Sequence, residues 1–282
     1  MLREATPEDA AAIDAFLTPY TETSMFLRGN LASHGVGWTD ARHSTRFWLW
    51  EEGGMQGVFG LTKAGFMMIQ LPDLNPAANA AFAREVAGHS IAGISGAADQ
   101  VARLLSALRL EDAAFSLLRD EPLYRMALAD LPVNTEATRP PVASDIPMLE
   151  RWLTEYMLDT ETAPSRAVAE EQAKPRAAAA PGSSMRLLLQ DGMSVAMAAL
   201  NAQVDGTVQV GGVYVPREMR NRGLGRKMVI ALLSDAMANG ARDAILFAAS
   251  EAAAHVYEAV GFHKIGTYKL ALLAAPVDIT PV

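Results

Sequence analysis

The sequence predicts an α+β protein (mixed α/β) made of two domains with similar folds. Its 282 residues correspond to about two domains at roughly 150 residues each. Segments with strand-like and helix-like hydrophobic periodicity alternate along the chain, which is typical of mixed α/β architecture. The two halves also share a pattern of residues, which indicates an internal duplication.

The repeat rests on matches at two spacings. Arg3 and Arg139 lie 136 residues apart (139 − 3), and Tyr124 and Tyr268 lie 144 apart (268 − 124). The change of eight residues (144 − 136) implies an insertion early in the second copy. Chance similarity in a chain rich in alanine and leucine is the alternative. Further matches are Asp9/Asp145, Leu17/Leu153 and Tyr20/Tyr156 at the first spacing, and Pro72/Pro216, Arg125/Lys269 and Pro132/Pro276 at the second.

Each copy begins with a pattern typical of a short strand, a capped turn and an amphipathic helix. The proline and polar residues of 131–139 mark the expected boundary, so the predicted domains are 1–133 and 137–282. Residues 163–184 are expected to form a short helix and a mobile loop, and the aromatic run 38–66 a buried hairpin. In the second half the pattern predicts helices at about 144–158, 222–239 and 251–260, and strands at about 185–190, 193–204, 207–215, 243–249 and 264–273.

Composition excludes several classes of protein. The formal charge is −8, from 24 basic and 32 acidic residues, whereas a nucleic-acid surface usually makes a domain basic. The absence of cysteine excludes disulfides, thiolate metal sites and a cysteine nucleophile. The five histidines lack a metal-binding spacing, so no metal site is expected. The N-terminus lacks the features of a signal peptide and the apolar runs are too short to span a bilayer, so a cytoplasmic protein without membrane contact is expected.

One segment departs from the acidic character of the chain. Residues 217–227 hold five basic residues against one acid, between an apolar strand that ends at Pro216 and an amphipathic helix. Glycines let an anion approach the backbone, and a helix N-terminus presents free N–H groups to it. The spacing Arg220-x-x-Gly223-x-Gly225 is neither a P-loop nor a Rossmann fingerprint. The alternative is a solvated basic helix start with glycines at a tight turn.

A second motif lies downstream, in residues 250–262, where Ala253, Val256, Tyr257 and Gly261 follow another strand. With the Arg-x-x-Gly-x-Gly loop, this order resembles the GCN5-related N-acetyltransferase (GNAT) superfamily over about residues 137–274. The resemblance implies two domains, each with a central, mostly antiparallel mixed sheet flanked by helices. It also implies acetyl-CoA as cosubstrate.

The resemblance assigns roles to individual residues. The loop of the family binds the pyrophosphate of acetyl-CoA, with Arg226 and Lys227 able to help. The strand before it bulges, here at Gly211 and Gly212, and pairs with the pantetheine arm. Tyr257 becomes the general acid for the CoA thiolate, or else is a packing residue. The cofactor-binding residues are then Val213, Tyr214, Val215, Arg220, Asn221, Arg222, Gly223, Leu224, Gly225, Arg226 and Ser250.

The function implied is transfer of an acetyl group from acetyl-CoA to the primary amine of a small molecule or peptide, by direct attack in a ternary complex. A non-catalytic acyl-CoA sensor on the same fold is the alternative, and a protein or nucleic-acid partner on the basic segment is a third. The strands that would carry a general base for the amine proton offer Gln203, Asp205 and Gln209 but no glutamate. No general base is therefore assigned. The first copy has Asp73 and two prolines where the loop would be, and is expected to be degenerate. The expected role of the first copy is to form part of the acceptor site or a homodimer surface.

Overall fold

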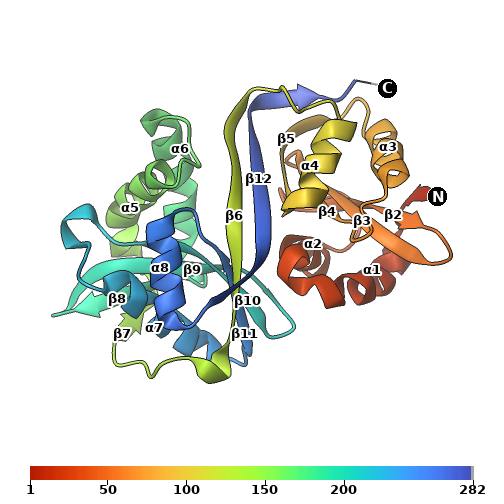
Figure 1. The fold of residues 1–282 in the computed structure, drawn as a ribbon. Helices are drawn as coiled ribbons and strands as arrows, with labels where there is room; N and C mark the ends of the chain where they lie inside the picture. The colour runs from red at the N-terminus through yellow and green to blue at the C-terminus, as the bar shows by residue number, and fades with distance from the viewer. Residues whose placement is uncertain (281–282) are drawn as a thin grey trace. The chain divides into compact units, whose positions relative to one another are not determined.

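The computed structural model describes residues 1–280. The chain forms two compact units. Unit 1 comprises residues 1–121 and the chain from residue 266 onward, and unit 2 comprises residues 122–265. Each unit is a mixed sheet with helices packed on it (Figure 1).

The elements follow in chain order. Those of the first half are β1 (Leu2–Glu4), α1 (Ala10–Leu17), α2 (Thr21–His34), β2 (Thr45–Glu51), β3 (Met55–Thr62), β4 (Phe66–Gln70), α3 (Pro76–Glu85), β5 (Ser90–Ala97), α4 (Ala98–Ala107) and β6 (Phe115–Ala127). Those of the second half are β7 (Ala137–Arg139), α5 (Ile146–Asp159), α6 (Arg166–Ala179), β8 (Arg186–Gln190), β9 (Met193–Val204), β10 (Thr207–Tyr214), α7 (Leu224–Ala238), β11 (Asp243–Phe247), α8 (Glu251–Val260) and β12 (His263–Asp278).

The two sheets have the same order and direction of strands. Unit 1 reads β1-β2-β3-β4-β5-β12 and unit 2 reads β7-β8-β9-β10-β11-β6. In both, the first four strands are antiparallel, the fourth and fifth are parallel, and the last is antiparallel to the fifth. The similarity of the halves in sequence therefore has a counterpart in their topology.

The last strand of each sheet comes from the other half of the chain. β12 follows β11 in sequence but pairs with β5 in unit 1, where Tyr268 lies opposite Ala97. β6 follows β5 but pairs with β11 in unit 2, where Tyr124 lies opposite Leu246. Figure 1 shows this as a dark blue strand in the unit that is otherwise red to yellow. The two halves have exchanged their final strands.

This exchange divides the chain differently from the expected boundary at 131–139. The compact units separate at residues 121/122 and again at 265/266, within the long strands β6 and β12. The proline and polar residues of 131–139 instead connect β6 to β7, and both of these pair within unit 2. The turn signals were real, but they mark a connection inside one unit rather than a linker between two.

Most elements expected in the second half are formed close to their expected bounds, and the hairpin expected within 38–66 is β2 and β3. The segment 163–184 differs, because it contains the 14-residue helix α6 with Pro175 inside it. Ala169, Ala173 and Ala177 recur at every fourth position of α6 and are fully buried in the cluster that α6 forms with α5. Close packing of these small side chains stabilises a helix that its proline disfavours.

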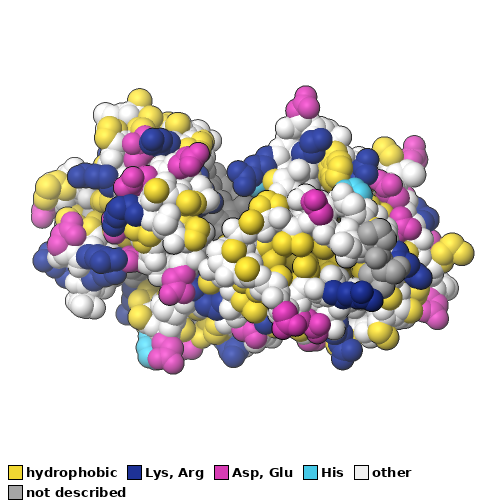
Figure 2. All heavy atoms as spheres, turned by 90° about the horizontal axis from the view of Figure 1, so that it is seen from above, with side chains coloured by type: hydrophobic (Ala, Val, Ile, Leu, Met, Phe, Trp, Pro, Cys, Tyr) yellow, Lys and Arg dark blue, Asp and Glu magenta, His cyan; other side chains and the backbone are white. Residues whose placement is uncertain are grey.

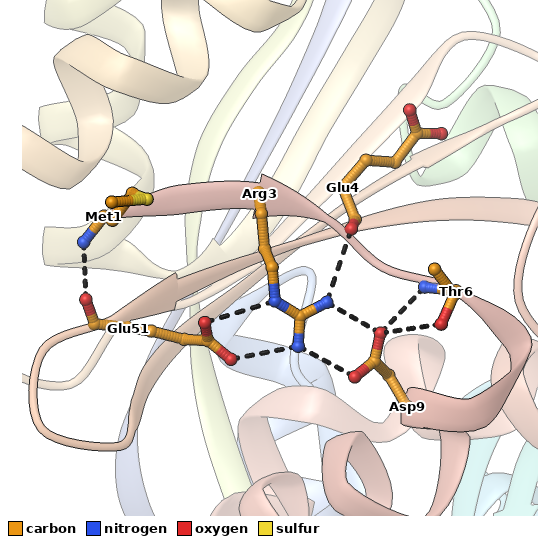
Figure 3. A network of polar contacts seen from close by, with 6 residues as sticks. All are labelled: Met1, Arg3, Glu4, Thr6, Asp9 and Glu51. Carbon is orange, nitrogen blue, oxygen red and sulfur yellow. Dashed lines mark hydrogen bonds and ion pairs between the residues drawn. The ribbon is translucent and has the colours of Figure 1, made fainter.

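Equivalent ion pairs close the first turn of both units. In unit 1, Arg3 contacts both oxygens of Asp9 at 2.8 Å and also bonds Glu51 (Figure 3). In unit 2, Arg139 contacts Asp145 at 2.6 and 2.8 Å. Each aspartate also accepts a hydrogen bond from the backbone N–H of the residue three positions earlier in the chain. The pairing places β1 and β7 in the same way before the first helix of their units.

The Asp145 carboxylate makes stability depend on pH. Its ion pair with Arg139 lowers its pKa, despite the opposing effect of burial. A lowered pKa contributes stability above the unfolded value of about 3.9, and this contribution is lost as pH falls through the folded pKa. We expect Asp145→Asn to reduce the free energy of unfolding by about 1–2 kcal/mol at pH 7, and by less at pH 3, below the unfolded pKa. Denaturant titrations at both pH values measure this, with the exposed Asp112→Asn as control. An equal loss at both pH values would contradict the prediction.

Candidate functional site

Strand β10 is irregular where the sequence places two glycines. Its register with β9 shifts after Gln209 and again between Gly211 and Tyr214, and Gly212 has a φ of +60°. The parallel ladder with β11 joins 207–209 to 243–245. Within the described residues, the rest of β10 pairs with β9 alone. The bulge expected at Gly211 and Gly212 is therefore present, and it lies where β10 leaves its parallel neighbour.

The loop that follows is exposed and contains two residues with left-handed backbone. Asn221 and Gly223 have φ angles of +62° and +73°, and residues 221–223 are exposed. Gly223 is the N-cap of α7 and has no side chain to cap the helix. Left-handed residues beside the free N–H groups of a helix start are typical of loops that bind anions.

Of the two motif glycines, Gly223 has a backbone conformation that requires glycine more than that of Gly225 does. No atom lies within 4 Å of the position that a Cβ would take at Gly223, so its backbone conformation, rather than space, favours glycine there. A Cβ at Gly225 would lie 3.9 Å from both Val215 and Val256, which is ordinary contact. These contacts also show that the start of α7 lies between the end of β10 and helix α8.

The arginines of the loop are engaged by acids of α5. Arg217 contacts Asp159 at 2.7 Å, and Arg220 contacts the other oxygen of the same carboxylate. Arg220 also donates from Nε to the carbonyl of Val215 at 3.0 Å. Arg222 donates to the Glu218 carbonyl at 3.4 Å. The Arg220 side chain therefore points back toward β10 and α5.

Lys227 and Ser250 have structural partners. Lys227 contacts Glu136 at 2.8 Å, and this contact lowers the pKa of Glu136. Ser250 is the N-cap of α8, where its hydroxyl accepts the N–H of Ala253. The geometry thus gives Ser250 a capping role, which was not foreseen when the motif suggested a cofactor contact.

Tyr257 lies in the core beneath the loop. Its side chain is 8 % exposed and belongs to the cluster that includes Leu224. Its ring meets Phe262 edge to face at 6.2 Å. The next residue, Glu258, accepts a 2.8 Å hydrogen bond from Tyr124 of β6 and thereby raises the pKa of that tyrosine. The exchanged strand β6 therefore helps to hold the helix that carries Tyr257.

The strand residues of the motif divide between the two faces of the sheet. Val213 and Val215 pack against the cluster formed with α7 and α8. Tyr214 packs on the other face with Trp152, at a ring distance of 6.0 Å. Burial raises the pKa of Tyr214.

A cavity of about 550 Å³ opens beside Tyr214, and its carboxylates were missed from the sequence. The strands had offered no glutamate, and Asp205 indeed lies in a turn with Gly206. The acids come instead from helices and from the start of the loop. For Glu155 a signal existed. It lies four residues before Asp159 near the C-terminus of α5, where two neighbouring acids are unfavourable without partners. The cavity is lined by Glu150, Arg151, Trp152, Thr154, Glu155, Arg166, Glu170, Lys174, Tyr214, Pro216 and Glu218.

On the face drawn in Figure 2, basic and acidic side chains are interspersed. Across residues 1–280, no three metal-ligating side chains come together in a way that could hold an ion. No helix in the described part of the chain is both long and apolar enough to cross a bilayer.

Unit 2 thus combines a mixed sheet, a bulged strand and an exposed turn at a helix start. Residues 146–262 match the model of the Acetyltransferase (GNAT) family. This segment of the chain is therefore a GNAT acetyltransferase domain. A search of the curated proteins finds no significant match.

Solved structures share the fold over the whole chain. A Drosophila protein has a TM-score of 0.62 at 13% identity, with 96% of this chain and 98% of that chain covered. A GCN5-related N-acetyltransferase from Kribbella flavida has 0.55 at 18%, with 89% and 94% covered. One from Sphaerobacter thermophilus has 0.55 at 16%, with 100% and 96% covered. At these identities the likeness shows a shared fold.

Proposed function

We propose that this protein is an acetyl-CoA-dependent N-acetyltransferase whose cofactor site is the 220–225 loop of unit 2. The observation that carries the proposal is the exposed turn at Asn221 and Gly223, placed at the uncapped start of α7 and directly after the bulged strand. Such a turn suits a pyrophosphate, because its N–H groups and the helix dipole act on the same anion.

The neighbouring elements fit the rest of the cosubstrate. Beyond Gln209 the β10 backbone has left β11, so residues 213–215 lie past the end of the parallel ladder. An extended pantetheine arm can pair there as an added strand does. A backbone N–H of this strand would also stabilise the thioester oxyanion.

Acetyl-CoA supplies an activated acetyl group, and residues of unit 2 arrange its transfer. The amine nitrogen forms a bond to the acetyl carbon while the carbon–sulfur bond breaks. Tyr257 gives its proton to the departing sulfur, and a cavity carboxylate or water takes the proton from nitrogen. The cavity beside Tyr214 would hold the acceptor, a small-molecule or peptide amine, so that the attack is effectively intramolecular.

Unit 1 is proposed to lack this activity although its strands have the same order. At the equivalent helix start, the Asn75 side chain accepts the N–H of Ala77 and so occupies the end of α3. Asp73 and Glu52 line a cavity of about 190 Å³ beside it. A capped helix end flanked by carboxylates disfavours a phosphate.

The proposal is tested by binding and by turnover. Acetyl-CoA at 100 times its Kd should stabilise the protein by about 2.7 kcal/mol in thermal unfolding. With an amine panel, Tyr257→Phe should lower kcat by roughly 100-fold or more while the Kd for acetyl-CoA stays unchanged. No thermal shift at millimolar acetyl-CoA would refute the cofactor site. Binding without turnover of any amine would favour the acyl-CoA sensor instead.

A further inference from the structure

Asp159 occupies an unusual position at the end of helix α5. It is the last residue of the helix, where the helix dipole disfavours an acid. Glu155 lies one turn earlier, so two like charges are neighbours on the helix surface. The side chain of Asp159 is only 22% exposed. A carboxylate in this place requires compensating partners.

Its partners are the two arginines that begin the cofactor loop. One carboxylate oxygen contacts Arg217 at 2.7 Å and the other contacts Arg220. Burial alone would raise the pKa of Asp159, but these two ion pairs outweigh it and lower the pKa. Asp159 is therefore ionised at neutral pH and holds both guanidinium groups at once.

Arg220 connects Asp159 to the loop. Its guanidinium bonds the Val215 carbonyl at the end of β10 and lies 5.7 Å from the ring centre of Tyr214. The next residues, Asn221 and Gly223, have left-handed backbone. A non-glycine residue in that region needs its surroundings to hold it there. Arg220 thus fixes the point from which the anion-binding turn departs.

We propose that Asp159 is a positioning residue that holds the 220–225 loop, through Arg217 and Arg220, in the form that binds the cosubstrate. This inference rests on the proposed function of the loop. The same helix carries Glu155, Trp152 and Glu150 in the wall of the acceptor cavity. Through Asp159, α5 connects that cavity to the loop.

A competing role for Asp159 would predict the opposite change in affinity for the cosubstrate. If Asp159 competed with phosphate for the arginines, its removal would tighten binding. If it holds the loop, its removal weakens binding. The sign of the change therefore separates the two.

The first measurement needs no ligand. In hydrogen exchange of the whole protein, Asp159→Asn should speed exchange of the hydrogen-bonded amides of Met219 and Arg220 by about 10-fold or more, and Asp159→Glu should largely restore the slow rates. The matched control is Glu171→Gln, which removes one charge from the exposed surface of α6. Unchanged exchange in Asp159→Asn would overturn the proposal.

The second measurement is calorimetric binding of acetyl-CoA. Asp159→Asn and Arg220→Gln should each raise the Kd by about 10-fold, or 1.4 kcal/mol, and the double variant should bind no worse than either alone. Glu171→Gln should leave the Kd unchanged. Tighter binding by Asp159→Asn, or additive losses in the double variant, would overturn the positioning role. Failure of the wild type to bind acetyl-CoA would instead refute the proposed function, and with it this role.

Discussion

A fragment of residues 115–265 is expected to fold and bind acetyl-CoA, whereas a fragment of residues 137–282 is expected to do neither. The first retains β6 and the whole of unit 2. The second retains the family motif but lacks β6, so β11 loses its antiparallel neighbour.

The size of the effect follows from what β6 and the residue after it bury. Tyr124, Met126 and Leu128 are at most 3% exposed within the cluster that also holds Tyr257. Each buried side chain contributes about 1.5–3 kcal/mol, and a domain is stable by only about 5–15 kcal/mol. Loss of all three, together with an unpaired strand edge, removes most of that margin.

Circular dichroism and thermal unfolding of both fragments measure this directly. A synthetic peptide of residues 115–131 supplies the control, since it should restore cooperative unfolding to the fragment of residues 137–282. If that fragment melts cooperatively and binds acetyl-CoA without the peptide, then β6 is dispensable and the prediction is wrong.

The second large effect is expected at Gly223. Gly223→Asp should raise the Kd for acetyl-CoA by at least about 100-fold, because a carboxylate at the helix start replaces and repels the phosphate. Gly223→Asn introduces the same backbone strain at a φ of +73° without the charge, and asparagine tolerates this region. It should change the Kd by no more than about 10-fold.

Calorimetry with acetyl-CoA compares the two variants, and their melting temperatures without ligand should be similar. Equal losses of affinity in both variants would mean that strain or bulk, rather than charge, disturbs the site. Unchanged affinity in Gly223→Asp would place the phosphate elsewhere.

The local structure of the site could be predicted from sequence, because glycine and proline fix it. β10 ends at Tyr214, two residues before Pro216, and the bulge is at Gly211 and Gly212. Helix α8 has its expected bounds and is capped at its C-terminus by Gly261. These features depend on backbone conformations that few residues tolerate.

The strand exchange could not be predicted. Residues 123–133 (LYRMALADLPV) and 267–277 (TYKLALLAAPV) are alike in sequence, so either strand presents a similar pattern to either sheet. Each tyrosine finds a partner in its own place, with Tyr124 bonded to Glu258 and Tyr268 to Ser95. A local pattern specifies a last strand but does not specify which sheet receives it.

The ion pairs of Asp159 were missed for a related reason. They join residues 58 and 61 positions apart in the sequence, and no local pattern relates a helix end to a later loop. The lining of the acceptor cavity is likewise assembled from α5, α6 and the end of β10. Packing in three dimensions brings these carboxylates together.

The exchanged strands also set the order in which a growing polypeptide can complete its parts. Unit 2 is continuous in sequence, so all of its strands have left the ribosome once residue 265 has emerged. Unit 1 begins first but lacks its last strand until β12 follows. During synthesis at about 5–20 residues per second, the later unit can therefore finish folding before the earlier one, and β5 keeps an open edge until β12 has emerged.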